Sequence, residues 1–134
     1  MIQDKVVVRQ ENGKLLKGYI SDFHPEKPTF YISLMDSSPG KPPLKVQVSE
    51  LKAIFFVKDF AGNPGRRGIQ SFPVSKSYSG RKIMIDFNDG ETLMGTTTDY
   101  DPNRPGFFVF PADKESNNKR CFVLRSATKK ISLI

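Results

Sequence analysis

The sequence has one cysteine, one histidine and no tryptophan. Because Cys121 is alone, the chain cannot form an internal disulfide, as expected for a protein of a reducing compartment. Cys121 also lies in an apolar run, where we expect a buried and unreactive thiol. His24 and Cys121 together are too few for a Cys/His zinc site or for a supported Cys-His catalytic pair. These absences predict a protein that holds no metal.

Long apolar runs are also lacking. Asp4 and Lys5 interrupt the N-terminal residues before a signal-peptide core could form, and no stretch approaches the ~20 apolar residues that span a bilayer. No paired acid/base motif, nucleophile elbow or phosphate-binding glycine loop is recognisable. We therefore predict a cytoplasmic protein that has no cofactor and no membrane partner and is not an enzyme.

The residues that are present favour an all-β fold and a basic surface. The 134 residues allow one ordinary domain or two very small ones. Ten Gly, ten Pro and eleven Phe, with many Val, Ile and Thr, favour short strands and turns over long helices. Lys and Arg number 21 against 14 Asp and Glu, which gives a net charge of +7. This balance favours an anionic partner.

An internal repeat is the most informative feature of the chain. Residues 5–32 match residues 82–109 without a gap, and eight of these 28 positions are identical. Every matched pair has the same spacing along the chain, which we call the repeat offset, so the sequence predicts a duplication. The repeated glycine, aspartate and proline positions, which we interpret as a structural motif, are Gly13 and Gly90, Gly18 and Gly95, Asp22 and Asp99, Pro25 and Pro102, and Pro28 and Pro105.

Each copy divides into five short strands. Apolar residues alternate at Val6 and Val8, and Asn12-Gly13 then predicts a hairpin with a type I′ turn, in which both residues have positive φ. Gly18 lies inside the second strand, where we expect a bulge or a sharp bend. The fold class predicted is therefore all-β, with two tandem five-stranded SH3-like or Sm-like barrels. The first barrel spans 1–58, a basic Gly/Pro/Ser-rich linker spans 59–80, and the second barrel spans 81–134.

The repeated pattern also resembles a known family. Apolar-x-apolar, Asn/Asp-Gly, Leu-x-Gly and a later Asp resemble the first motif of Sm-like proteins. The unit is similar as well to an uncharacterised group of bacterial proteins in which it recurs with an Asp-aromatic-x-Pro-x-basic-Pro-x-Phe continuation. This resemblance covers nearly all of each copy, omits the linker and implies small β-barrels. An Sm-like RNA site would also use a second motif near the fourth and fifth strands, and none is recognisable here.

Four basic residues are candidates for anion binding. Arg66 and Arg67 lie in a Gly-rich segment, and guanidinium groups suit phosphate. Lys27 and Arg104 occupy equivalent repeat positions, so they are either a pair that contacts the same kind of anion twice or two solvated loop charges.

The repeated aspartates and prolines have a structural interpretation as well. Asp22 and Asp99 are expected to cap backbone N–H groups of the loop that follows. The proline loops are expected to form rigid corners, with a paired binding surface as the alternative.

The function predicted is a non-enzymatic binding or adaptor module, with another protein as partner. The alternative is RNA or single-stranded nucleic acid, bound by the basic linker and by stacking on Tyr31, Phe60 and Tyr78. A PilZ-like cyclic dinucleotide receptor is less favoured, because its two arginines are four residues apart and Gln70 follows Arg66 at that spacing. The oligomeric state does not follow from the sequence.

Overall fold

The computed structural model describes residues 3–36, 40–60, 80–112 and 116–134, and over these ranges the protein is all-β, as predicted. The first half contains β1 (Asp4–Gln10), β2 (Leu15–Ile20), β3 (Thr29–Leu34), β4 (Leu44–Gln47) and β5 (Leu51–Val57). The second half contains β6 (Arg81–Phe87), β7 (Thr92–Thr97), β8 (Gly106–Pro111), β9 (Asn118–Leu124) and β10 (Thr128–Leu133). Short 3-10 turns, η1 (Val48–Glu50) and η2 (Arg125–Ala127), precede β5 and β10.

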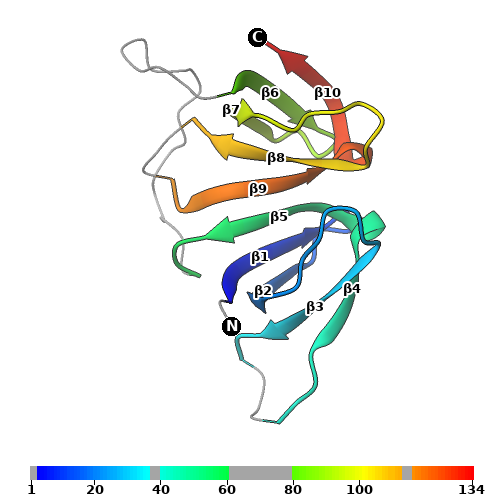
Figure 1. Ribbon diagram of the computed structural model, residues 1–134, viewed down its shortest axis with the longest axis vertical. Coiled ribbons are helices and arrows are strands. Elements are labelled where there is room, and N and C mark those ends of the chain that lie inside the picture. The colour runs from blue at the N-terminus through cyan, green and yellow to red at the C-terminus, as the bar shows by residue number, and fades with distance from the viewer. Residues whose placement is uncertain (1–2, 37–39, 61–79, 113–115) are drawn as a thin grey trace.

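All ten strands belong to one antiparallel sheet (Figure 1). Its strand order is β10-β6-β7-β8-β9-β5-β1-β2-β3-β4, so the two halves meet where β5 pairs with β9. Within each half the order is the same, the last strand lying beside the first and the fourth strand outermost on the other side. Over the described ranges the sheet is open by hydrogen bonding, with β4 and β10 at its edges, and it is not divided into two closed barrels.

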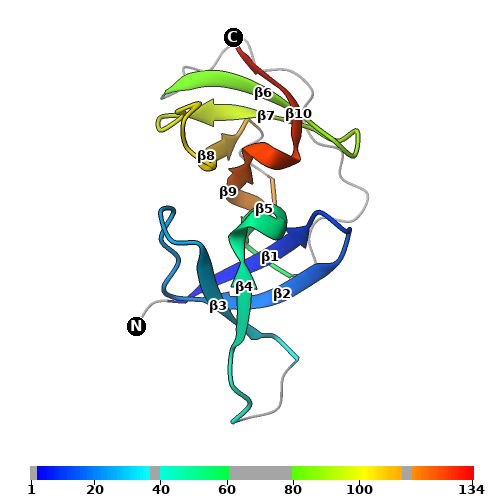
Figure 2. The same ribbon diagram turned by 90° about the vertical axis from the view of Figure 1, so that its right-hand side faces the viewer.

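Positions related by the repeat offset take equivalent places in the ladders of the two halves. The 3-10 turns η1 and η2 are related by the same offset. Figure 2 shows them in equivalent places before β5 and β10. The matched ladder pairs are Val6–Gly18 with Ile83–Gly95, and Phe30–Val46 with Phe107–Val123.

The first hairpin of each half is present, but its turn differs from the predicted type. Gly13 and Gly90 have φ values of +89° and +91°, and no described residue other than glycine has a positive φ. A type I′ turn needs a positive φ at both central residues, so that prediction is wrong. The Gly13 N–H donates to the Gln10 carbonyl at 3.0 Å, which fits a three-residue loop that ends in a left-handed glycine.

Gly18 and Gly95 are required by a close approach of backbone. A Cβ on Gly18 would lie 2.3 Å from the Ser33 carbonyl oxygen, and one on Gly95 would lie 2.1 Å from that of Phe110. The β1–β2 and β6–β7 ladders run without a register shift, so the bulge expected here is absent. The glycines instead allow the backbones of β3 and β8 to approach closely.

The sheet carries two hydrophobic cores, one for each half, and the junction strands contribute to both. Along β9, Phe122 and Leu124 pack in the first core, whereas Cys121 and Val123 pack in the second. Phe55 of β5 likewise packs against the second core, whereas Leu51, Ile54 and Phe56 pack in the first. Because successive side chains of a strand point to opposite faces, the junction is buried on both faces of the sheet.

Within the described ranges, no helix is long and apolar enough to cross a membrane.

Candidate functional site

Two equivalent turns carry the basic residues that the repeat pointed to. The Lys27 N–H donates to the His24 carbonyl in the connection before β3, at 3.0 Å. The Arg104 N–H donates to the Asp101 carbonyl in the connection before β8, also at 3.0 Å. These bonds hold the Lys27 and Arg104 backbones at the same position of the two turns.

A second pair of equivalent bonds fixes each turn to the neighbouring 3-10 turn. The Val48 N–H donates to the Pro28 carbonyl at 2.9 Å, and the Arg125 N–H donates to the Pro105 carbonyl at 2.9 Å. Proline has no N–H, but its carbonyl accepts normally and its ring fixes φ. Each half therefore presents a tethered corner made of a proline loop and a 3-10 turn.

The two corners line one groove, which has a volume of about 610 Å³. The loops and 3-10 turns that form it lie on the right-hand side of Figure 1. A groove of this volume falls in the range of ligand-binding pockets. Its apolar lining comes from Pro25, Pro28, Val48, Pro105 and Leu124.

The groove has a positive rim. Lys27, Arg104 and Arg125 line it, and Glu26 is the one carboxylate among the described lining residues. Arg104 has an ion pair with Asp101 at 3.9 Å, but both side chains are largely exposed, so the pair is weak. An anionic ligand therefore meets three cations beside an apolar surface.

The structure brings together only part of the predicted anion-binding set. Lys27 and Arg104 share the groove, whereas Arg66 and Arg67 lie outside the described residues. Sequence reasoning missed Arg125, because the equivalent residue in the first half is Val48 and a search for repeated residues passes over it.

The two repeated aspartates differ in their surroundings. Asp99 accepts from the Phe108 N–H at 3.1 Å and from the Thr97 hydroxyl at 3.2 Å, so it caps the backbone of β8. Its equivalent, Asp22, is exposed. Asp99 therefore caps a strand N–H, and not an N–H group of the following loop as predicted for both aspartates.

Of the three aromatic residues suggested as stacking surfaces, the structure describes two. Tyr31 is 47% exposed on β3. Phe60 instead packs edge-to-face on Tyr19, with ring centroids 5.4 Å apart, and Tyr78 lies outside the described residues. Phe60 thus offers an edge that is already in contact with another ring, whereas Tyr31 is the more exposed of the two.

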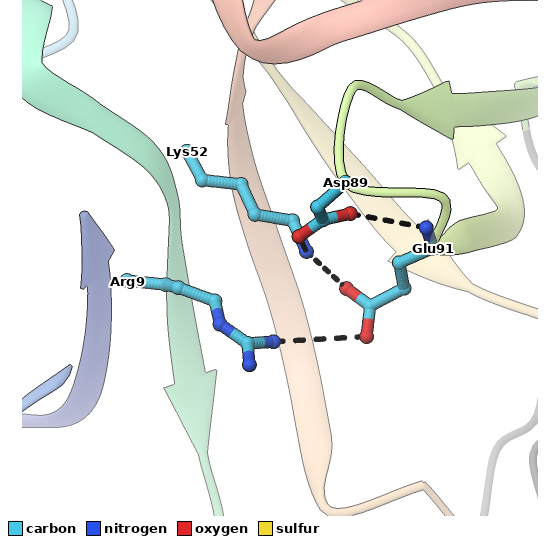
Figure 3. Close-up of polar contacts among 4 residues, drawn as sticks. All are labelled: Arg9, Lys52, Asp89 and Glu91. Carbon is cyan, nitrogen blue, oxygen red and sulfur yellow. Dashed lines mark hydrogen bonds and ion pairs between the residues drawn. The ribbon is translucent and has the colours of Figure 1, made fainter. Parts of the chain in front are cut away.

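A cluster of charged residues joins the two halves at the junction (Figure 3). Lys52 of β5 is only 4% exposed, and its Nζ lies 2.7 Å from Asp89 Oδ2 and 2.5 Å from Glu91 Oε1. Arg9 approaches Glu91 at 3.7 Å, and the Lys52 ammonium lies 4.5 Å from the centre of the Phe87 ring. A buried ammonium needs such partners, so we interpret this cluster as structural.

The same contact shifts a carboxyl pKa. The hydrogen bond from Lys52 lowers the pKa of Asp89, and a hydrogen bond from the Glu91 N–H acts in the same direction. The sequence held a signal for this cluster that was missed, namely a lysine inside the otherwise apolar run Leu51–Val57.

Two further features bear on chemistry. Cys121 is completely buried, and burial raises the pKa of its thiol, so the prediction of an unreactive cysteine fits its surroundings. Among the described residues, no group of three or more His, Cys, Asp or Glu side chains is placed to hold a metal ion.

Comparison with known proteins gives a family over nearly the whole chain, residues 2–134. The chain belongs to DUF6982, a family of unknown function. The match covers both halves and the segment between them. No curated protein and no solved structure matches the chain. The geometry of the groove is therefore the main guide to function.

Proposed function

We propose that this DUF6982 protein is a non-enzymatic binding module that holds an extended acidic segment of a partner protein in the groove. An aliphatic side chain of that segment would pack on the accessible surface of Pro25, Pro28 and Pro105. Its flanking carboxylates would meet Lys27, Arg104 and Arg125. The observation that carries the proposal is that two equivalent turns present their basic residues to one groove.

The lining favours a peptide over a nucleic acid. Single-stranded nucleic acids bind by stacking on aromatic rings, and the described residues that line the groove include no aromatic side chain. Carboxylates suit the site instead, because guanidinium groups bind them in a bidentate geometry and lysine binds them as a point charge.

We propose further that the chain arose by duplication of one small SH3-like or Sm-like unit. The equal strand order of the halves, the ladder pairs related by the repeat offset and the two proline-carbonyl bonds support this origin. One unit alone would supply one wall of the groove. On this view, duplication created the binding site by placing two corners side by side.

The test is selection of peptides from a random phage-displayed library against the full chain, followed by anisotropy titration of the best labelled peptide. We expect selected sequences that combine aliphatic and acidic residues. The double variant Lys27→Glu/Arg104→Glu should bind the peptide at least about tenfold more weakly, which corresponds to about 1.4 kcal/mol.

The matched control is Lys41→Glu/Lys119→Glu, which makes the same change in net charge at two exposed lysines outside the groove lining. Equal losses in the two double variants would mean that overall charge, and not the groove, governs binding.

A second candidate is single-stranded nucleic acid, which the net charge of +7 favours. Titration with a labelled RNA oligonucleotide at two salt concentrations tests it. A steep loss of affinity with salt would support phosphate neutralisation, and an absence of binding at low salt would eliminate it.

A further inference from the structure

Among the described strands, β10 lies at one edge of the sheet, and its equivalent in the first half is not an edge strand. That equivalent is β5, which accepts β9 along its free side. Ile54 and Phe56 of β5, which face Phe122 and Arg120 of β9, correspond to Ile131 and Leu133 of β10. The position of β10 is thus one at which the other half of this chain already accepts a strand.

Some peptide groups of β10 point to its outer edge, as the equivalent groups of β5 point to β9. The Ile134 N–H donates to the Lys82 carbonyl of β6 at 2.9 Å. Because bonded and non-bonded pairs alternate in an antiparallel ladder, Ser132 also bonds to β6, whereas Ile131 and Leu133 turn their peptide groups to the free edge. Bonded and non-bonded peptide groups alternate along β5 in the same way. Directly after β5, the Lys58 N–H donates to the Asn117 carbonyl at 2.8 Å.

The side chains of β10 differ from those of β5 in a consistent way. Ala53 and Phe55 of β5 are replaced by Lys130 and Ser132. Leu133 lies on the face of Ile131 and is 37% exposed, whereas Ile134 lies on the face of Lys130 and is 63% exposed. A strand added here would therefore meet a cation on one face and uncovered apolar surface on the other.

We propose that the β10 edge accepts an antiparallel strand from a partner protein in which acidic residues alternate with aliphatic ones. An acidic residue would lie opposite Lys130, and aliphatic residues would lie opposite Ile131 and Leu133. Opposite charges that face each other across an antiparallel pair stabilise it, and the backbone bonds of an added strand supply the rest of the affinity. This surface is separate from the groove and goes beyond the function proposed above.

A second copy of the chain fits this edge poorly. Its strand equivalent to β9 is β4, which is only four residues long and follows Pro42 and Pro43. Lys45 of β4 stands at the position of Phe122, so it would lie opposite Ile131 and next to Lys130. Prolines and lysines at sheet edges oppose strand pairing between copies.

The test uses the full chain and a blocked peptide of sequence Glu-Val-Glu-Ile-Glu-Val, followed by NMR titration and amide hydrogen exchange. We expect slower exchange at the Ile131 and Leu133 amides in the presence of the peptide. Two further peptides are N-methylated, one on the odd and one on the even residues. Strand addition uses one edge of the peptide, so one of the two should lose binding and the other should retain it.

Matched variants separate this edge from the other charged surfaces. Lys130→Glu should weaken peptide binding about fivefold or more, because a like charge replaces an opposite one. Lys45→Glu, which makes the same change at the β4 edge, should leave binding unchanged.

Three outcomes would overturn the proposal. Equal binding of both N-methylated peptides would exclude strand addition. Loss of binding in Lys27→Glu/Arg104→Glu, with no effect of Lys130→Glu, would place the peptide in the groove. Protection of Ile131 and Leu133 by concentrated protein alone would make a second copy the occupant. Failure of the β10 edge leaves the phage-selected peptides of the groove unaffected, so the two proposals can be judged separately.

Discussion

The junction between β5 and β9 and the two outer edges of the sheet are built from equivalent strands but carry different side chains. At the junction, Ile54 and Phe56 of β5 face Phe122 and Arg120 of β9. At the edges, β10 and β4 repeat these backbone positions and pair with no outer strand among the residues described. Lys45 takes the place of Phe122 on β4, so this ladder position is apolar at the junction and charged at the β4 edge.

The charged side chains also differ between the junction and the edges of the sheet. Lys52 of the first half meets Asp89 and Glu91 of the second. The equivalents of these three residues are Lys129, Asn12 and Lys14, so a repeat of the junction between two copies would place lysine against lysine. The comparison teaches that side chains at the two edges, and not backbone geometry, oppose a repeat of the junction pairing between copies.

The largest expected effect is on stability, and it follows the loss of an apolar side chain at the junction. Phe122→Ala should lower the free energy of unfolding by about 3–5 kcal/mol, because it leaves a cavity in the first core. Lys45→Ala, at the equivalent position of β4, should change it by less than about 0.5 kcal/mol. Urea denaturation followed by far-UV circular dichroism measures both, and equal midpoints would break the comparison.

In the charged cluster, removing the two carboxylates should cost more stability than removing the lysine. Asp89→Asn/Glu91→Gln leaves the Lys52 ammonium buried without a carboxylate, which should cost about 3 kcal/mol. Lys52→Met should be nearly neutral, because the two carboxylates are half exposed and can be hydrated while methionine keeps the apolar packing. Thermal melts of the two variants test this difference, and an equally large loss in Lys52→Met would contradict it.

Giving the two edge strands the side chains of the junction strands should cause the protein to self-associate. In the variant Lys45→Phe/Lys130→Ala/Ser132→Phe, β4 and β10 carry the residues of β9 and β5 at these positions. We expect a mass that rises with protein concentration in sedimentation velocity, since the edge would become an apolar pairing surface. Lys41→Ala/Lys119→Ala is the control for lost positive charge, and it should sediment like the unchanged protein.

The smallest effect is a pH dependence that arises at the junction. Because the pKa of Asp89 is lowered in the folded protein, its carboxylate stabilises the fold above about pH 4 and loses this effect as pH falls through the folded pKa. Asp89→Asn should therefore lose less stability than the unchanged protein between about pH 5 and pH 3. Thermal melts at the two pH values measure this difference, and an equal loss in the two proteins would contradict it.

Local patterns made the strands and the hairpins predictable. Alternating apolar residues and the Asn12-Gly13 and Asp89-Gly90 dipeptides act within a few residues, so they mark strands and turns directly. The turn type was wrong because glycine alone takes the positive φ. Lys27 and Arg104 were found through the repeat, whereas their approach in one groove depends on how the halves pack.

The junction itself was beyond the sequence analysis, since the pairing of β5 with β9 joins segments that lie far apart along the chain, one in each half. The sequence did hold a signal for it. Ala53–Val57 and Cys121–Leu124 are continuous apolar runs, which are typical of strands covered on both faces. An edge strand with one solvated face alternates instead, as Lys130 to Leu133 does.

The double-sided burial of β9 decides how interactions of this protein can be mapped. A fragment that stops before β6 would lack Phe122 and Leu124, and a fragment that starts there would expose them to water. Either piece would lose a ligand through misfolding, whatever surface the ligand occupies. Deletion mapping is therefore uninformative here, and single-site changes in the intact chain are the suitable means of locating a partner.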